Sequence, residues 1–202
     1  MQRSKTDNGD LQAKLELRRH FLRKYHADGR TSVLDCCQGD GIIWSNLRSE
    51  FSFEYWGVDL KPRKGRLKID SVRILEQTGW TQNVVDFDTY GSAWKHWAAM
   101  LPNIVQSTTV FLTIGAIMFA GAVDEVARDA MGLRFQDPPL PASICGKLND
   151  LAVGYCLAKC HGYGIRIIEA QEALSDGNAR YIGIRLEPLE MTFECDGRMN
   201  GA

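Results

Sequence analysis

The chain has 202 residues, a formal net charge of −1 and a hydrophobic content of 45%, values typical of one soluble globular domain with a sizeable core. The near-zero charge excludes a global attraction to nucleic acid, so any such binding needs a local basic patch. No apolar run approaches the roughly 20 residues that span a bilayer, and the N-terminus lacks a signal peptide's apolar stretch. The six cysteines lack a zinc-type spacing, so we expect reduced thiols, no metal site and a cytoplasmic protein.

The first predicted element is a helix over residues 11–25, where Leu11, Leu15 and Phe21 recur near helical spacing. Its other face carries five basic residues: Lys14, Arg18, Arg19, Arg23 and Lys24. Such a face is either solvated, on a helix that covers a sheet, or a patch that contacts phosphates. We treat residues 1–29 as an N-terminal helical segment.

A strand, a turn and a helix are predicted next, over residues 32–47. The apolar strand ends at Asp35, the turn contains Gly39 and Gly41, and an amphipathic run begins at Ile42. This is the opening of a nucleotide-binding α/β domain, because glycines let a ligand approach the backbone and the helix N-terminus offers unpaired N–H groups. A second apolar run, residues 55–58, ends at Asp59, where a carboxylate could bind a ribose diol.

The glycine spacing indicates which nucleotide binds. A dinucleotide fingerprint needs a small residue where this chain has Trp44 or Ile42. The turn instead resembles the first motif of the class I S-adenosylmethionine (SAM) methyltransferases, an acid followed by three small positions. That resemblance implies SAM as the cofactor and places several residues at its site: Asp35, Cys37 (where the family usually has glycine), Gly39, Gly41, Asp59 and Leu60.

A basic loop over residues 61–66 follows, which is either solvated or faces a polyanionic substrate. Residues 67–69 form a predicted third strand that ends at Asp70 and Ser71. In the SAM enzymes this strand end lies near adenine, so the resemblance implies that Asp70 accepts a hydrogen bond from the adenine amino group, with Ser71 beside it. Either residue equally suits the N-cap of a helix over 72–78.

The fourth predicted strand, residues 82–87, leads into Asp88-Thr89-Tyr90-Gly91-Ser92 and a helix over 93–101. This run resembles the Asp-Pro-Phe-Gly-Ser-Pro motif of the tRNA N2,N2-dimethylguanosine methyltransferases and, more broadly, the Asp/Asn-Pro-Pro-Tyr motif of enzymes that methylate base amino nitrogens. Thr89 and Ala93 replace the prolines. The resemblance implies that Asp88 accepts a hydrogen bond from the amino group, that Tyr90 stacks on the base, and that Phe87 lies at the cofactor site. Alternatively, Asp88 caps the helix and Tyr90 packs.

The remaining chain predicts a fifth strand over 107–113, a lid or dimer contact over 114–143, a helix over 143–161 and a hairpin over 165–186. With the resemblance, these elements imply a doubly wound α/β fold whose mostly parallel, seven-stranded sheet ends in an antiparallel hairpin strand. The SAM-binding domain would span 30–187, with a peripheral tail at 188–202.

The functional hypothesis is a SAM-dependent methyltransferase that acts on an exocyclic amino nitrogen of an RNA or DNA base, held through local basic patches. The alternatives are a small-molecule or protein acceptor, and a non-catalytic nucleotide-binding protein of the same fold. The four histidines predict no catalytic centre of their own. No membrane contact is expected, and no oligomeric state is predicted.

Overall fold

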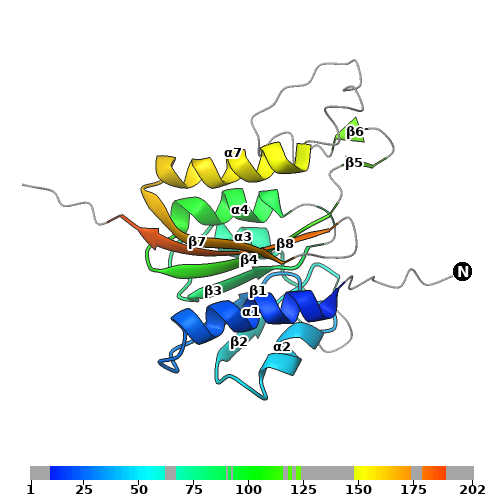
Figure 1. The fold of residues 1–202 in the computed structure, drawn as a ribbon, viewed down its shortest axis with the longest axis vertical. Helices are drawn as coiled ribbons and strands as arrows, with labels where there is room; N and C mark the ends of the chain where they lie inside the picture. Colours follow the sequence, from blue (N-terminus) through cyan, green and yellow to red (C-terminus); the bar gives the residue numbers. More distant parts are fainter. Residues whose placement is uncertain are drawn as a thin grey trace, which may run out of the picture.

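The central feature of the computed structural model is a six-stranded sheet covered by helices on both faces (Figure 1). The described residues are 10–61, 67–89, 91, 93–115, 118–119, 122–123, 148–173 and 179–189. The strands of this sheet are β1 (Ser32–Asp35), β2 (Glu54–Gly57), β3 (Val84–Phe87), β4 (Thr108–Ile114), β7 (Ile165–Ala173) and β8 (Arg180–Pro188). A separate short pair consists of β5 (Met118–Phe119) and β6 (Ala122–Val123).

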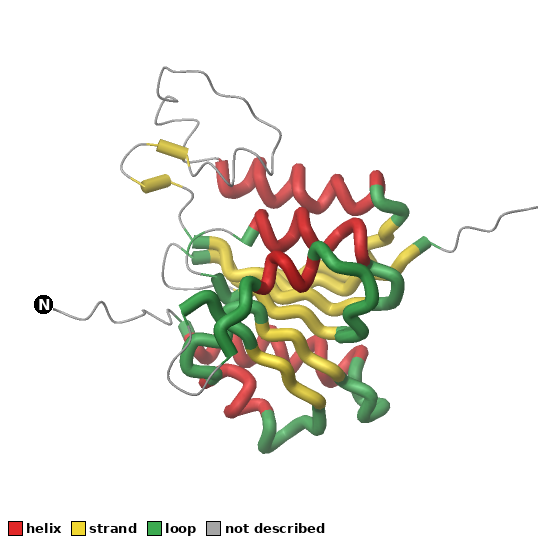
Figure 2. Tube along the Cα trace, turned by 180° about the vertical axis from the view of Figure 1, so that it is seen from behind, coloured by secondary structure: helices red, strands yellow, loops and turns green. Residues whose placement is uncertain are grey.

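The helices form the two outer layers. Figure 1 shows α1 (Leu11–Tyr25) and α2 (Ile42–Leu47) on one face of the sheet. The other face carries α3 (Ser71–Leu75), α4 (Trp94–Met100), with the 3-10 turn η1 (Leu101–Asn103), and α7 (Leu148–Gly162), an arrangement that Figure 2 shows from behind. Within the described residues no helix is long and apolar enough to cross a membrane.

The strand order is β2-β1-β3-β4-β8-β7. The first four strands are parallel, and β8 runs antiparallel to both β4 and β7. The predicted doubly wound fold with an antiparallel hairpin strand is therefore confirmed. Because β1, β2 and β3 run in one direction, the loops that follow them meet at one edge of the sheet, which is where ligands bind in open α/β sheets.

The predicted count of seven strands is wrong for the part of the chain that the structure describes, where the sheet has six. The expected third strand, residues 67–69, makes a single bridge between Lys68 and Asp59. Leu67 is 53% exposed, so this segment buries too little apolar surface to hold a longer strand.

A close approach of α1 to the sheet depends on a glycine in β8. A Cβ at Gly183 would lie 2.5 Å from the ring of Phe21, so only glycine lets this ring lie against the strand. The Phe21 ring also meets Phe111 of β4 edge-on, at 5.8 Å between centroids. On the opposite face of the sheet, Trp94 and Trp97 are buried in a separate hydrophobic core.

Two residues on the basic face of α1, Lys14 and Arg18, contradict both predictions made for that face. Lys14 is 4% exposed and Arg18 is 1% exposed, so neither is solvated and neither lies on the surface as a phosphate contact. Arg18 donates to both carboxylate oxygens of Asp86, from Nε at 2.9 Å and from Nη2 at 2.7 Å. The Trp44 indole N–H donates to the same carboxylate at 2.8 Å. Asp86 lies on β3 at the middle of the sheet, and this paired acid explains why the arginine points inward.

We predict that Arg18→Met lowers the free energy of unfolding by about 3–5 kcal/mol, because it leaves the Asp86 carboxylate buried without its cation. Arg23→Met on the same helix is the control: the Arg23 side chain is 65% exposed and lies 3.3 Å from Glu50, so little change is expected. Urea denaturation of both variants measures the difference. Equal midpoints would contradict the assigned role of the Arg18–Asp86 pair.

Candidate functional site

The turn between β1 and α2 is fastened to the two neighbouring strands. The Cys36 N–H donates to the Asp86 carbonyl at 2.9 Å, and the Gln38 N–H donates to the Val58 carbonyl at 3.0 Å. Gly39 and Gly41 have φ values of 48° and 68°, a left-handed conformation that side chains disfavour. The turn therefore presents backbone at the carboxyl end of the sheet, as the sequence motif predicts.

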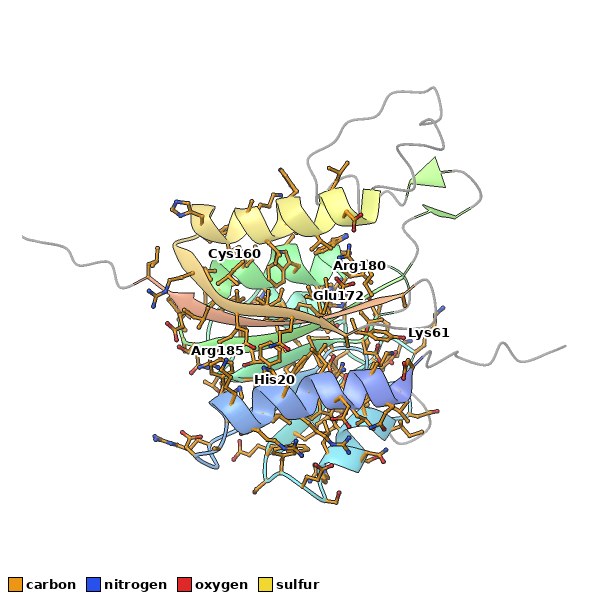
Figure 3. All side chains as sticks on the ribbon, viewed as in Figure 1. His20, Lys61, Cys160, Glu172, Arg180 and Arg185 are labelled. Carbon is orange, nitrogen blue, oxygen red and sulfur yellow. The ribbon has the colours of Figure 1, made fainter. Side chains whose placement is uncertain are left out.

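Asp59 lies against this turn. Its Oδ2 accepts a hydrogen bond from the Gly39 N–H at 3.0 Å, and its Oδ1 accepts one from the Lys61 N–H at 2.7 Å. The structure thus brings together two of the predicted cofactor residues, Gly39 and Asp59. Figure 3 shows Lys61 at the end of the molecule where α1 begins, whereas Arg185 lies toward the opposite end. Leu60, also predicted for this site, is 58% exposed.

Asp35 lies beneath the turn and is 4% exposed. Its Oδ2 accepts a hydrogen bond from the Tyr55 hydroxyl at 2.7 Å, and its Oδ1 accepts one from the Cys37 N–H at 3.2 Å. A Cβ at Gly57 would lie 2.4 Å from the Gln38 Nε2 and 2.7 Å from the Tyr55 Oη. Gly57 therefore leaves the space in which these two side chains meet.

Burial, followed by the nearby charge of Asp86, raises the pKa of Asp35 to about 8. The hydrogen bonds from Tyr55 and from the Cys37 N–H act in the opposite direction but do not outweigh burial. Asp35 is consequently neutral over much of the physiological range. Burial also raises the pKa of the Cys37 thiol, with Asp35 and Asp59 adding to the shift, so this cysteine remains a thiol.

Three further residues predicted for the cofactor site, Asp70, Ser71 and Phe87, lie at the start of α3 and the end of β3. Asp70 caps α3 by accepting a hydrogen bond from the Val72 N–H at 3.0 Å. The Ser71 hydroxyl donates to the Cys36 carbonyl at 2.9 Å, and Phe87 is fully buried. Asp70 is thus the N-cap, one of the two alternatives that the sequence left open for it.

His96 of α4 joins these residues, and the sequence analysis assigned it no part. Its Nε2 lies 3.0 Å from the Ser71 Oγ, and its ring lies 5.3 Å from the Phe87 ring. Burial lowers the pKa of His96 to about 4, so the ring is neutral at pH 7. Its buried Nδ1 has no hydrogen-bond partner among the described residues.

Asp88 follows β3 and is 16% exposed. The Lys14 ammonium of α1 lies 2.6 Å from its Oδ1. Burial raises the pKa of Asp88, but the charges of Lys14 and Arg18 and the hydrogen bonds from Lys14 and Thr113 outweigh burial, so the pKa lies below its ordinary value.

The alternative role predicted for Asp88, capping the following helix, is wrong, because Ala93 is the N-cap of α4. The other residue predicted for the acceptor, Tyr90, lies outside the described residues. So do residues 62–66 of the basic loop and 124–143 of the predicted lid. Within the described part of the chain, no group of acidic, histidine or cysteine side chains could hold a metal ion.

The fold is similar to that of the class I SAM-dependent methyltransferases. Trm1 from Pyrococcus horikoshii, in complex with S-adenosyl-L-methionine, is similar with a TM-score of 0.63 and 15% identity over 89% of this chain and 55% of that chain. TrmN from Thermus thermophilus is similar with a TM-score of 0.50 and 14% identity, over 87% of this chain and 49% of that chain. A proposed hemolysin from Streptococcus thermophilus is similar with a TM-score of 0.54 and 10% identity, over 93% of this chain and 70% of that chain.

This chain therefore spans about half the length of the first two of these proteins. No family model matches the sequence, and a comparison with curated proteins found no match.

We predict that Asp35→Asn flattens the dependence of stability on pH. Because the folded chain holds a proton on Asp35 that the unfolded chain releases near pH 4, stability of the parent falls as pH rises from about 4 to about 8. An amide resembles the neutral carboxyl group and does not titrate, so the variant loses that part of the slope. Urea denaturation across this pH range measures it, and identical slopes in parent and variant would refute the assignment.

Proposed function

We propose that this chain is a SAM-dependent methyltransferase whose acceptor is the exocyclic amino group of a nucleic-acid base. The observation that carries the proposal is the contact between Asp59 and the glycine turn, at the carboxyl end of the parallel strands. In this fold, that edge is the position for a nucleotide ligand. The similar structure of Trm1 holds S-adenosyl-L-methionine, which supports the same cofactor here.

The residues present fit that cofactor. The left-handed Gly39 and Gly41 leave their backbone uncovered by any Cβ. A ribose diol can donate hydrogen bonds to the Asp59 carboxylate, which already faces this turn. Near Ser71 and Phe87, the buried Nδ1 of His96 is an acceptor without a partner among the described residues, which suits a region that receives a polar ring.

Asp88 supports the choice of acceptor. A carboxylate accepts hydrogen bonds from an exocyclic NH2 group and can thereby orient the nitrogen lone pair toward an electrophile. The Asp88 carboxylate lies close enough to the Cys37 thiol to raise its pKa, so it neighbours the turn that would hold the cofactor. SAM, when bound, supplies an electrophilic methyl group on a positively charged sulfur. In this proposal the protein's own task is to position the amino group and exclude water.

We predict that the chain binds SAM and S-adenosylhomocysteine but not NAD, and that Asp59→Ala weakens this binding by about 1–3 kcal/mol through the lost charge-assisted hydrogen bonds. Titration calorimetry measures both effects. Glu54→Ala is the matched control, because Glu54 begins β2, the strand that precedes Asp59, and is exposed. Binding of NAD alone would exclude a methyltransferase.

For the acceptor, we predict that the parent chain transfers labelled methyl groups from SAM to bulk tRNA, rRNA or DNA, and that Asp88→Ala and Tyr90→Ala each reduce the rate by at least about 100-fold, the scale of lost positioning. SAM binding should survive both substitutions. Transfer that persists in both variants excludes these residues from the acceptor site. Cofactor binding without transfer to any nucleic acid would favour a small-molecule or protein acceptor, or a non-catalytic protein.

A further inference from the structure

We infer that Lys14 of the first helix is a positioning residue of the acceptor site, which acts through Asp88 by holding its carboxylate ionised and fixed in direction. This inference rests on the proposed function, since it concerns how the same site receives an amino group. The sequence alone predicts a separate N-terminal segment for this helix, with either a solvated or a phosphate-binding face.

The contact between the two residues is direct and protected. The Lys14 Nζ lies 2.6 Å from the Asp88 Oδ1, and the exposed fractions of the two side chains are 5% and 16%. The ammonium also lies 5.0 Å from the centroid of the Tyr181 ring, over its face. The Tyr181 ring and the Asp88 carboxylate therefore hold the ammonium from two sides.

The other buried cation of α1, Arg18, is already engaged elsewhere. Arg18, one turn later, donates from Nη1 to the Lys14 carbonyl at 3.0 Å. Arg18 uses its other nitrogens to bind Asp86. Among the described residues, Lys14 is therefore the cation that donates a hydrogen bond to Asp88. The neighbouring Thr113 on β4 contributes a neutral hydrogen bond to the same carboxylate.

The titratable groups around Asp88 come from α1, from the end of β1 and from the turn that follows β1. Lys14 and Arg18 face it from α1 and favour its ionised form, whereas Asp35 at the end of β1 shares its surroundings and is itself influenced by the Asp88 charge. The Cys37 thiol lies in the same surroundings. Without the lysine, burial would favour the protonated acid, which is a weaker hydrogen-bond acceptor than the carboxylate and has an O–H donor on one of its two oxygens.

The pairing also limits what Asp88 does. A carboxylate held ionised by an ammonium is a weak base, so its task is to accept a hydrogen bond and orient the amino group rather than to remove its proton. Lys14 itself is buried against Asp88 and Tyr181 and needs no contact with the acceptor. The inference therefore predicts a change in the pH profile of transfer when the lysine is lost.

The test compares Lys14→Met, Lys14→Gln and Lys14→Arg with Lys24→Met as the control. Lys24 lies farther along the same helix, and its Nζ is also 2.6 Å from a carboxylate oxygen, that of Glu169. His20, which Figure 3 labels, contacts the same carboxylate. Carbon-13 NMR follows the carboxyl titrations, with the Asp88 signal assigned from its absence in Asp88→Asn. Methyl transfer is measured from pH 5 to 9 on whichever nucleic acid the parent modifies.

We expect the Asp88 titration to move upward by about 1–3 pH units in Lys14→Met and Lys14→Gln, the scale for losing an opposite charge at contact. Transfer should fall about tenfold for each pH unit below the shifted pKa. Lys14→Arg should keep the parent profile, and Lys24→Met should leave both measurements unchanged. If Lys14→Met does not fold, Lys14→Gln, which retains a hydrogen-bond donor, carries the same expectation.

An Asp88 titration that is identical in the parent and in the folded uncharged variants overturns the inference, whatever the chain does to RNA. A shifted titration with an unchanged pH profile of transfer overturns it as well, because the pair would then be structural only. A parent chain that binds SAM but methylates no nucleic acid, with the titration shifted, overturns the proposed acceptor instead.

Discussion

The ion pair between Arg18 and Asp86 is the interaction on which the arrangement of this end of the sheet depends. It joins the first helix to the central parallel strand through two hydrogen bonds that are almost completely withdrawn from water. An isolated buried charge would cost far more free energy than a small domain can supply, so the helix and the strand must keep this register. The same register places Lys14, one turn earlier, at Asp88 just beyond the strand end. A packing constraint thereby also sets the charge of a candidate functional side chain.

Four carboxylates lie around the ends of three neighbouring strands, and the chain accommodates each in a different way. Asp86 is paired with a guanidinium and Asp88 with an ammonium, both from α1. Asp35, buried and close to Asp86, has a raised pKa and keeps its proton. Asp59 remains partly exposed and accepts hydrogen bonds from backbone N–H groups. These solutions are interdependent, because the paired acids take the available cations and Asp35 is left to avoid charge by protonation.

The parts of this fold that sequence could predict are those encoded by local patterns. The apolar spacing predicted a helix over 11–25, and α1 has these bounds, with Asp10 as its N-cap. The glycine turn and the terminal hairpin were also predictable, since both depend on neighbouring residues. The inward direction of Lys14 and Arg18 was not, because their partners lie about 70 residues further along the chain. Basic side chains on a helix are normally solvated, and only the tertiary pairing identifies Lys14 and Arg18 as buried. His96 was missed for the same reason, since its contact with Ser71 joins two helices.

The two halves of the candidate site rest on separate structural supports. The Asp59 contact with Gly39 involves β2 and the turn after β1, whereas the Asp88 contact with Lys14 involves β3 and the first helix. Because no residue is shared between these two contacts, a change in one need not alter the other. A fold alone does not define an activity, and a chain of this fold could keep nucleotide binding after losing the geometry that receives an acceptor. In this chain the proposed acceptor side has a buried lysine in contact with the Asp88 carboxylate. Burying that ammonium has a free-energy cost that an exposed lysine would avoid, and the ion pair offsets this cost while it holds Asp88 ionised, as the proposed role of Asp88 requires.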